Sequence, residues 1–317
     1  MDEEDYPGTL MDLERRFATE DACRAYLFAL RWPQGFRCAD CGSDAYWQDK
    51  RGRVICARCQ HQRSVLAGTI FQDSRSPLVL WFRAVWWVTS QKNGASALGL
   101  QRILGLGSYE TAWTWLHKLR RAMVRPGRDA LSGRVEVDET YVGGEEEGVH
   151  GRETYKKALV VIAAQEDGDG IGRIRMRRVA DASAKSLIPF VRDAVEPGSL
   201  IHTDDWKPYA QLKKAGYKHK ITRLSGKKKT AAQLLPRVHQ VASLLQRWIL
   251  GTHQGAPSPD HLDYYLDEFV FRFNRRTSAH RGKLFYRLLQ NAVAVEPAPY
   301  ASLIKHVRGP RPAKHNR

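Results

Sequence analysis

The spacing of apolar residues changes along the chain and predicts a helical first third. After an acidic lead-in, apolar side chains recur at helical intervals up to residue 31, and they do so again over residues 76–88. Between these two stretches, residues 32–70 carry few helix signals and are expected to form short polar strands joined by glycine turns. Two shorter helices are predicted at 97–104 and 108–123, separated by the turn Gly105-Leu106-Gly107.

Beyond residue 130 the pattern changes to strands that later alternate with helices. Strands are expected at 135–142, 158–164, 171–179, 200–203 and 217–222, and helices at 183–195, 206–215, 233–250, 259–275 and 282–292. The order of the first eight elements is β-β-β-α-β-α-β-α. Three meandering strands followed by alternation predict an α/β fold with a mixed sheet and helices on its faces.

The net charge of the chain indicates which class of partner it binds. The formal net charge of the 317 residues is +17, with a pI near 9.8. Such an excess of clustered cations favours nucleic acid as the partner, because each phosphate that is neutralised releases condensed counterions. The apolar runs are too short to cross a bilayer, and the acidic start Met-Asp-Glu-Glu-Asp is unlike a secretory signal. We therefore expect a cytoplasmic protein without a membrane partner.

Four of the five cysteines form two matched pairs, Cys38-Ala-Asp-Cys41 and Cys56-Ala-Arg-Cys59. Each Cys-x2-Cys can form a tight turn that aims two thiolates at one point, and two such turns complete the tetrahedron that Zn²⁺ prefers. Four thiolates leave no open coordination position, so this zinc is expected to be structural. Cys23 stands alone on an apolar helical face and is expected to be a core thiol.

The two short helices around Gly105 have the spacing of a helix-turn-helix, for which the alternative is a plain helical hairpin in a core. The second helix carries a run of basic side chains near its end. We expect this basic face to contact DNA through Arg120 and Arg121, beside His117 and Lys118.

Three places in the strand-rich region carry side chains that a metal-dependent nuclease needs. Strand neighbours point to opposite faces, so Asp138 shares the more polar face with Glu136 and Thr140, away from Glu139. Asp204 comes just past the end of a short buried strand, where such sheets place ligands. His239 begins a stripe with Ser243 and Gln246 on the long helix that follows.

Several of these stretches together resemble one family. "VEVDETYVGG", "HTDDWKPY", "HQVASLLQRWILGTHQG" and "HLDYYLDEFVFRFNRR" are similar to the catalytic domain of bacterial insertion-sequence transposases with an N-terminal zinc ribbon, the insertion sequence family numbered fifteen ninety-five. "FRCADCGSD" and "CARCQHQRSVLAGTIFQDSRSPL" resemble the same family, so the likeness covers nearly the whole chain.

The resemblance implies an RNase H-like fold with a DDE-type catalytic triad. Asp138 matches the first aspartate and Asp204 the second, whereas His239 aligns with a position that usually holds Glu or Asn, and Gln246 replaces a downstream lysine. Two divalent ions, Mg²⁺ or Mn²⁺, would be held by this triad. An imidazole in place of a carboxylate lowers the negative charge of the site and favours the softer Mn²⁺.

The resemblance also implies the partners: transposon ends with terminal inverted repeats, target DNA, and a homodimer or larger synaptic complex. Phosphate contacts are expected from a lysine-rich loop at 213–229 and from the end of the helix at 259–275. The residues expected to make these contacts are Lys227, Lys228, Lys229, Arg272, Arg275 and Arg276. On the same helix, Glu268 is the main rival of His239 as third ligand.

The predicted domains are a helical lead-in (1–31), a zinc ribbon (32–70), a helical DNA-binding region (71–127), an RNase H-like catalytic domain (130–295) and a basic tail (296–317). Two alternatives to a transposase stay open. One is a DNA-binding regulator whose catalytic domain has decayed, which the imidazole at 239 and the glutamine at 246 would favour. The other is a cellular RNase H-like nuclease or resolvase.

Overall fold

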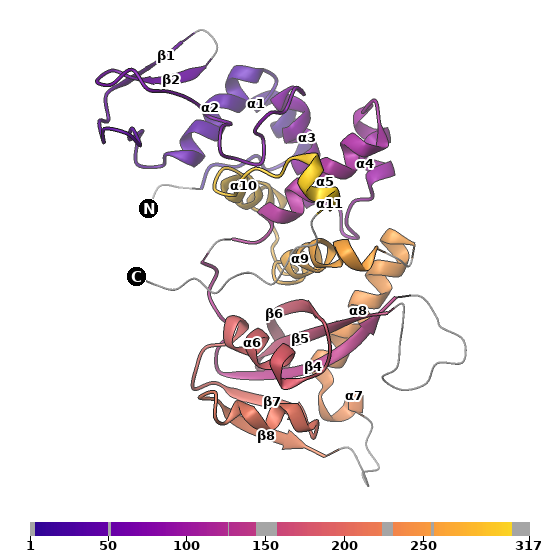
Figure 1. Ribbon diagram of the computed structural model, residues 1–317. Coiled ribbons are helices and arrows are strands. Elements are labelled where there is room, and N and C mark those ends of the chain that lie inside the picture. Colours follow the sequence, from indigo (N-terminus) through magenta and orange to yellow (C-terminus); the bar gives the residue numbers. More distant parts are fainter. Residues whose placement is uncertain are drawn as a thin grey trace. The chain divides into compact units, whose positions relative to one another are not determined.

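A computed structural model describes residues 4–49, 52–125, 127–143, 157–223, 231–254 and 257–305. The chain divides into two compact units (Figure 1). Unit 1 combines Met1–Pro126 with Ser278–Lys305, and unit 2 comprises Gly127–Thr277. Within the described residues, no helix has both the length and the apolar content needed to cross a bilayer.

Unit 1 consists of a small sheet and a group of helices. The sheet is antiparallel and has the order β1-β2-β3. Its strands are β1 (Tyr46–Gln48), β2 (Arg53–Cys56) and β3 (Gln62–Ser64). The helices are α1 (Leu10–Arg16), α2 (Glu20–Arg31), α3 (Leu78–Ser90), α4 (Ala97–Leu104), α5 (Tyr109–Ala122), α10 (Arg281–Ala292) and α11 (Tyr300–Lys305).

An aromatic cluster joins the start of the chain to α10. Phe82 of α3 lies 4.8 Å, centroid to centroid, from Phe17 and 5.7 Å from Phe285 of α10. All three rings are buried, so α10 packs on α2, α3 and α5. Helix α10, which we expected in the catalytic domain ending at residue 295, therefore belongs to unit 1, because its apolar face finds its partners there.

Unit 2 contains the expected mixed sheet, and the predicted α/β fold class is confirmed. Its five strands have the order β6-β5-β4-β7-β8; β4, β5 and β6 pair antiparallel, whereas β4, β7 and β8 pair parallel. The strands are β4 (Arg134–Val142), β5 (Ala158–Asp167), β6 (Gly170–Val179), β7 (Leu200–Asp204) and β8 (Lys218–Thr222). The helices are α6 (Ala184–Ala194), the 3₁₀ turn η1 (Lys207–Leu212), α7 (Ala231–Leu234), α8 (Pro236–His253), the 3₁₀ turn η2 (Pro259–His261) and α9 (Leu262–Phe273).

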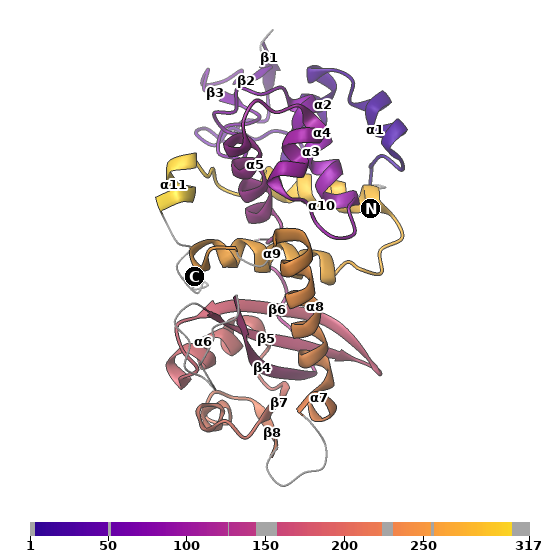
Figure 2. The ribbon, with the colours of Figure 1, turned by 90° about the vertical axis from the view of Figure 1, so that its right-hand side faces the viewer.

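The alternation of side chains along β4 separates two layers of core. Val135 and Val137 point to the face covered by α6 and η1, where they pack with Val191 and Tyr209. The residues that alternate with them, Glu136 and Asp138, point to the other face, which α8 and α9 cover. Figure 2 shows α8 running along that face of the sheet. The polar residues of β4 therefore meet α8.

Helix α9 protects the free edge of β6. Asp263 accepts a hydrogen bond from the backbone N–H of Arg178 at 3.0 Å, and Asn274 pairs with both backbone groups of Ile174. Arg276 donates to the carbonyl oxygens of Gly172 and Ile171. These side chains replace the missing neighbour strand, because unpaired edge groups otherwise invite association with other chains.

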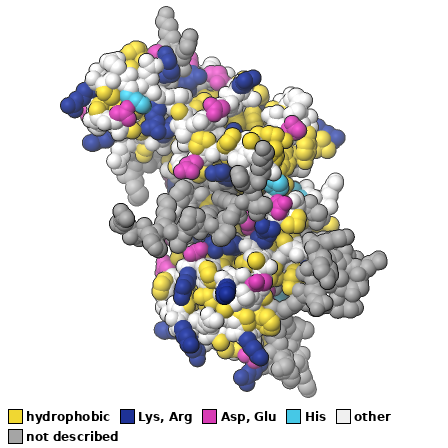
Figure 3. Space-filling model, viewed as in Figure 1, with side chains coloured by type: hydrophobic (Ala, Val, Ile, Leu, Met, Phe, Trp, Pro, Cys, Tyr) yellow, Lys and Arg dark blue, Asp and Glu magenta, His cyan; other side chains and the backbone are white. Residues whose placement is uncertain are grey.

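The positive charge is spread over the surface. On the face drawn in Figure 3, Lys and Arg side chains occur over the three-stranded sheet and over the five-stranded sheet. The edge strand β8, which was predicted at 217–222, contributes Lys218 and Lys220 from within the lysine-rich segment 213–229. Lysines on an edge strand also discourage edge-to-edge pairing.

Candidate metal centres

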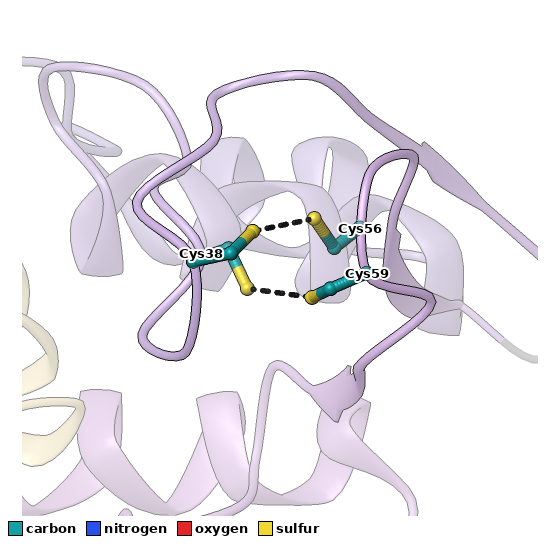
Figure 4. Close-up of side chains that lie close together, drawn as sticks. Cys38, Cys56 and Cys59 are labelled. Atoms are coloured by element: carbon teal, nitrogen blue, oxygen red, sulfur yellow. Dashed lines mark hydrogen bonds between the residues drawn. The ribbon is translucent and has the colours of Figure 1, made fainter.

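Two turns of unit 1 bring the four paired cysteines to one point (Figure 4). The sulfur atoms of Cys38 and Cys59 are 3.5 Å apart, and those of Cys41 and Cys56 are also 3.5 Å apart. A zinc–sulfur bond of 2.3 Å in a tetrahedron places its sulfurs about 3.8 Å from each other. The four thiols therefore fit a structural Zn²⁺, as the sequence predicts.

The two turns are copies of each other in their backbone hydrogen bonds. Cys38 accepts a bond from the N–H of Gly42, and Cys56 accepts one from the N–H of Gln60, both at 3.0 Å. The residue after the second cysteine is left-handed in each, with φ of +71° at Gly42 and +62° at Gln60. The N–H of Cys59 points to the sulfur of Cys56 and lowers the pKa of that thiol to about 6, which favours the thiolate that zinc requires.

Gln60 has a left-handed backbone conformation, which strains a residue with a side chain but not glycine. We expect Gln60→Gly to stabilise the zinc-bound turn by about 0.5–1 kcal/mol, because a side chain in the left-handed region costs about 1–2 kcal/mol and glycine's chain entropy offsets part of the gain. Competition with a chelator measures this as tighter zinc retention. Gly42→Ala is the matched control: the added Cβ meets nothing within 4 Å, so it should weaken retention by backbone strain alone. Equal retention in all three proteins would contradict the prediction.

In unit 2 the strand register brings the two predicted aspartates together. Strands β4 and β7 are parallel, and Glu136 pairs with His202. Continuing this register by two residues places Asp204 beside Asp138 on the face toward α8. One oxygen of each carboxylate is fixed by backbone: Asp138 Oδ1 accepts from the N–H of Glu139 at 2.9 Å, and Asp204 Oδ1 accepts from the N–H of Trp206 at 3.0 Å.

Helix α8 adds His239 to this pair. Its Nε2 lies 3.5 Å from Asp138 Oδ2 and is buried, and it has no hydrogen-bond partner among the described residues. Burial lowers the pKa of His239, while the charges of Glu136 and Asp204 act in the opposite direction. The lowered pKa favours the unprotonated imidazole, which can offer a lone pair. Two ligands of one octahedral ion lie about 3 Å apart, which is close to the observed separation.

Tyr209 is a residue of this site that sequence reasoning missed. Its buried hydroxyl donates to Glu139 Oε2 at 2.8 Å. Burial raises the pKa of Tyr209 well above its usual range, and the charges of Glu139, Asp138 and Asp204 raise it further. No local signal reveals this contact, because it joins residues 70 apart in the chain. Tyr209 fixes the end of β4 from the face opposite α8.

Gln246 faces the same strand two helical turns further along α8. Its amide nitrogen lies 3.5 Å from the hydroxyl of Thr140, the next residue of β4 on the face of Asp138. His239 and Gln246 thus follow one stripe of the helix across one polar row of the strand.

Two other places in unit 2 hold acidic side chains that could bind a metal, and in both the carboxylates form ion pairs with arginine. Buried Glu268 binds the guanidinium of Arg272 at 2.7 Å, which does not favour it as a third ligand of the aspartate pair. Ligand atoms of Glu136, Glu166 and His202 lie within 4.8 Å of one another. Arginines already balance these carboxylates, since Arg237 lies 3.1 Å from Glu136 and 3.4 Å from Glu166. This group is therefore a charge network.

In the helix-turn-helix segment of unit 1, two of the basic side chains near the end of α5 are buried, whereas we expected them to be exposed. Helices α4 and α5 contact each other and are joined by a turn with left-handed Gly105, buried Leu106 and the helix cap Ser108. His117 and Arg120 are only 0% and 2% exposed, so they do not form the exposed basic face that we expected. Their place on α5 follows the apolar stripe of the helix. The DNA contacts of Arg120 and Arg121 stay a prediction.

The arginines at the end of α9, which we expected to contact phosphate, also have partners within the protein. Arg272 pairs with Glu268, Arg276 binds the edge of β6, and the guanidinium of Arg275 lies 4.1 Å from the ring centre of Phe271. These interactions explain the three arginines structurally, and their DNA role stays a prediction. Lys227, Lys228 and Lys229 lie outside the described residues.

Family models match the two segments of the chain that contain the candidate metal centres. Residues 130–274 match the ISXO2-like transposase domain, and residues 18–62 match a transposase zinc-ribbon domain. An uncharacterised protein in the transposable element ISH50 of Halobacterium salinarum is 26% identical over 278 residues, which cover 81% of this chain and 92% of the relative.

Two solved structures share 12% sequence identity with the chain and cover 67% of it. The Mos1 strand transfer complex matches over 75% of its chain with a TM-score of 0.27, and a pre-cleavage Mos1 transpososome matches over 78% with a TM-score of 0.25. The sheet order of unit 2, together with the family match, makes this unit an RNase H-like domain. The chain belongs to the IS1595 family of transposases and carries an ISXO2-like DDE transposase domain behind a zinc ribbon.

Proposed function

We propose that this chain cleaves DNA at the ends of an insertion sequence and transfers the freed strands, with Asp138, Asp204 and His239 as ligands of divalent ions. The observation that carries the proposal is the meeting of His239 Nε2 and Asp138 Oδ2 at 3.5 Å, with Asp204 adjacent by strand register. The three side chains come from elements far apart in the sequence. Family membership supports the reaction class.

The residues of the site suit this chemistry. When bound, two divalent cations activate a water or a 3′-hydroxyl and stabilise the leaving oxygen of the phosphodiester. Asp138 and Asp204 each have one oxygen held by a backbone N–H, which orients the other for a metal. As a metal ligand, the imidazole of His239 would contribute a nitrogen and no charge, so the triad would carry two negative charges. Mg²⁺ prefers oxygen ligands, whereas Mn²⁺ accepts imidazole more readily.

DNA ends are the substrate that the charge of the chain favours. A net charge of +17 supplies the counterion release that stabilises binding to phosphate backbones. Joining two ends of one element requires two active sites near each other. A homodimer or larger complex on the terminal inverted repeats is therefore part of the proposal.

His239→Glu tests the metal assignment. We expect the wild-type protein to nick labelled end DNA faster with Mn²⁺ than with Mg²⁺. The glutamate variant should lower the Mn²⁺/Mg²⁺ rate ratio by roughly tenfold, because a carboxylate restores the hard ligand that Mg²⁺ prefers. Initial nicking rates across a concentration series of each ion give the ratio.

Three outcomes would reject parts of the proposal. Faster nicking with Mg²⁺ across all concentrations would reject the softer metal preference, and normal cleavage by His239→Ala would reject the ligand role. Specific binding of end DNA without cutting under any metal would support the decayed regulator, which the imidazole at position 239 favours. Cleavage of junctions or RNA–DNA hybrids without strand joining would select a cellular nuclease.

A further inference from the structure

Helix α8 begins without a cap of its own. The residue before it is Leu235, whose side chain cannot accept a hydrogen bond, and its first residue is Pro236, which has no N–H. The N–H groups of Arg237 and Val238 therefore need an acceptor from elsewhere. Glu136 supplies it: its Oε2 accepts from Arg237 N at 2.8 Å and from Val238 N at 3.1 Å.

The carboxylate of Glu136 is buried and fully engaged. Its side chain is 1% exposed, and its Oε1 accepts from the Arg237 guanidinium at 3.1 Å. The other guanidinium nitrogens of Arg237 donate to the carbonyl oxygens of Gly168 and Gly170, each at 2.9 Å. A charge persists in such a place only when it is paired and hydrogen-bonded, and the positive end of a helix dipole adds to its stability.

This contact joins the two elements that carry the candidate site. Glu136 lies two residues before Asp138 on the same face of β4, and Arg237 and Val238 immediately precede His239 on α8. The contact of Glu136 with α8 is therefore close to the pair of Asp138 and His239. It is two residues from Asp138 along β4 and one or two residues from His239 along α8. The position of the first turn of α8 therefore decides where the imidazole stands.

We propose that Glu136 is a positioning residue, which clamps the first turn of α8 to β4 and so sets His239 at metal-binding distance from Asp138. This inference rests on the proposed function, because it concerns the geometry of the same site. In this role Glu136 is not a metal ligand, because its oxygens are taken by α8 and Arg237.

Glu136→Gln separates positioning from general stability. The amide keeps one acceptor for the helix N–H groups but turns its NH₂ toward the guanidinium of Arg237, so the clamp loosens while the side-chain volume is retained. We expect the Mn²⁺ concentration for half-maximal nicking to rise by roughly tenfold or more, the range typical of lost supporting contacts around metal ligands. The rate at saturating Mn²⁺ should fall less.

A second readout does not depend on activity. Fe²⁺ with ascorbate and peroxide cuts a polypeptide near a bound ion. The wild-type chain should be cut near Asp138, Asp204 and His239. In Glu136→Gln the cut on α8 should weaken relative to the cuts on the two strands. Arg237→Lys, which keeps the backbone donors and loses the contacts to the glycine carbonyls, should show a smaller change in the same direction.

Glu20→Gln is the matched control, because Glu20 caps α3 in the same way. Its two carboxylate oxygens accept from the N–H groups of Leu78 and Val79, each at 3.0 Å, in unit 1. This variant should lose similar thermal stability yet keep the wild-type Mn²⁺ dependence and cutting pattern. A wild-type Mn²⁺ dependence and cutting map in Glu136→Gln would overturn the inference.

The two proposals fail in different ways. If the wild-type protein does not nick DNA, the proposed function fails while the cutting maps still decide the positioning role: a shifted map in Glu136→Gln supports it and an unchanged map overturns it. If Glu136→Gln does not fold, the maps of Arg237→Lys and wild type decide in the same way.

Discussion

Asp204→Asn is expected to reduce metal-dependent nicking about a thousandfold or more while leaving the protein folded. The substitution removes one of the two carboxylates that we propose as ligands of the cations. Such cations stabilise transition-state charge by several kcal/mol, and each 1.36 kcal/mol is a factor of ten in rate. The asparagine oxygen can still accept the bond from the N–H of Trp206, so the turn after β7 is preserved. Single-turnover nicking of labelled end DNA at saturating Mn²⁺ measures the loss.

The neighbouring Asp205→Asn is the control for this experiment. Asp205 is exposed and lies 3.1 Å from Arg223, an ion pair that contributes little at a surface. This variant loses the same charge one residue away and should nick within about twofold of wild type. Equal losses in both variants would show that net charge near β7 matters and that Asp204 has no special role. DNA binding by both proteins, measured at matched salt, excludes loss of substrate as the cause.

The sequence was sufficient for the sheet because its signals are local. The strand with Val135 and Val137 alternates apolar and polar residues, and the structure places that strand as predicted, next to the short strand that ends at Asp204. The helical stripe of His239 and Gln246 was also visible, because α8 is long and regular. Periodicity and strand order placed these side chains on the right elements, and the family resemblance was needed to propose which three of them meet.

The sequence was insufficient where a contact depends on tertiary packing. Glu136 caps α8 through Arg237, which is 101 residues further along the chain, and no sequence pattern around either residue predicts this contact. Arg120 was assigned to an exposed face because it is charged, yet it is 2% exposed and lies 3.5 Å from His117. Arg276 was likewise expected to contact phosphate because it is charged, although it donates to a carbonyl oxygen at the edge of β6. A charged side chain does not reveal in sequence whether it meets solvent or buried backbone.

Cys41→Ser is expected to leave the zinc ribbon unfolded and unit 2 intact. The segment from Cys38 to Ser64 has few apolar residues at its centre, mainly Val54 and Ile55, so zinc binding supplies most of its stability. Structural zinc contributes roughly 10–16 kcal/mol to the folding of such small domains, more than a typical domain's whole margin of 5–15 kcal/mol. Zinc content should fall from about one ion per chain to a small fraction of that. Mass spectrometry of the metal gives the stoichiometry.

Cys23→Ala separates ligand loss from thiol loss. Cys23 is also a buried cysteine of unit 1, but its sulfur lies 3.8 Å from the carbonyl oxygen of Phe17, and burial raises its thiol pKa to about 12. This variant should keep its zinc. Hydrogen exchange then locates the effect: in Cys41→Ser the amides of β2 and β3 should exchange quickly, whereas those of β4 and β5 stay protected. Slow exchange in β2 without zinc would show that the ribbon folds on apolar packing alone, and the metal would lose its structural role.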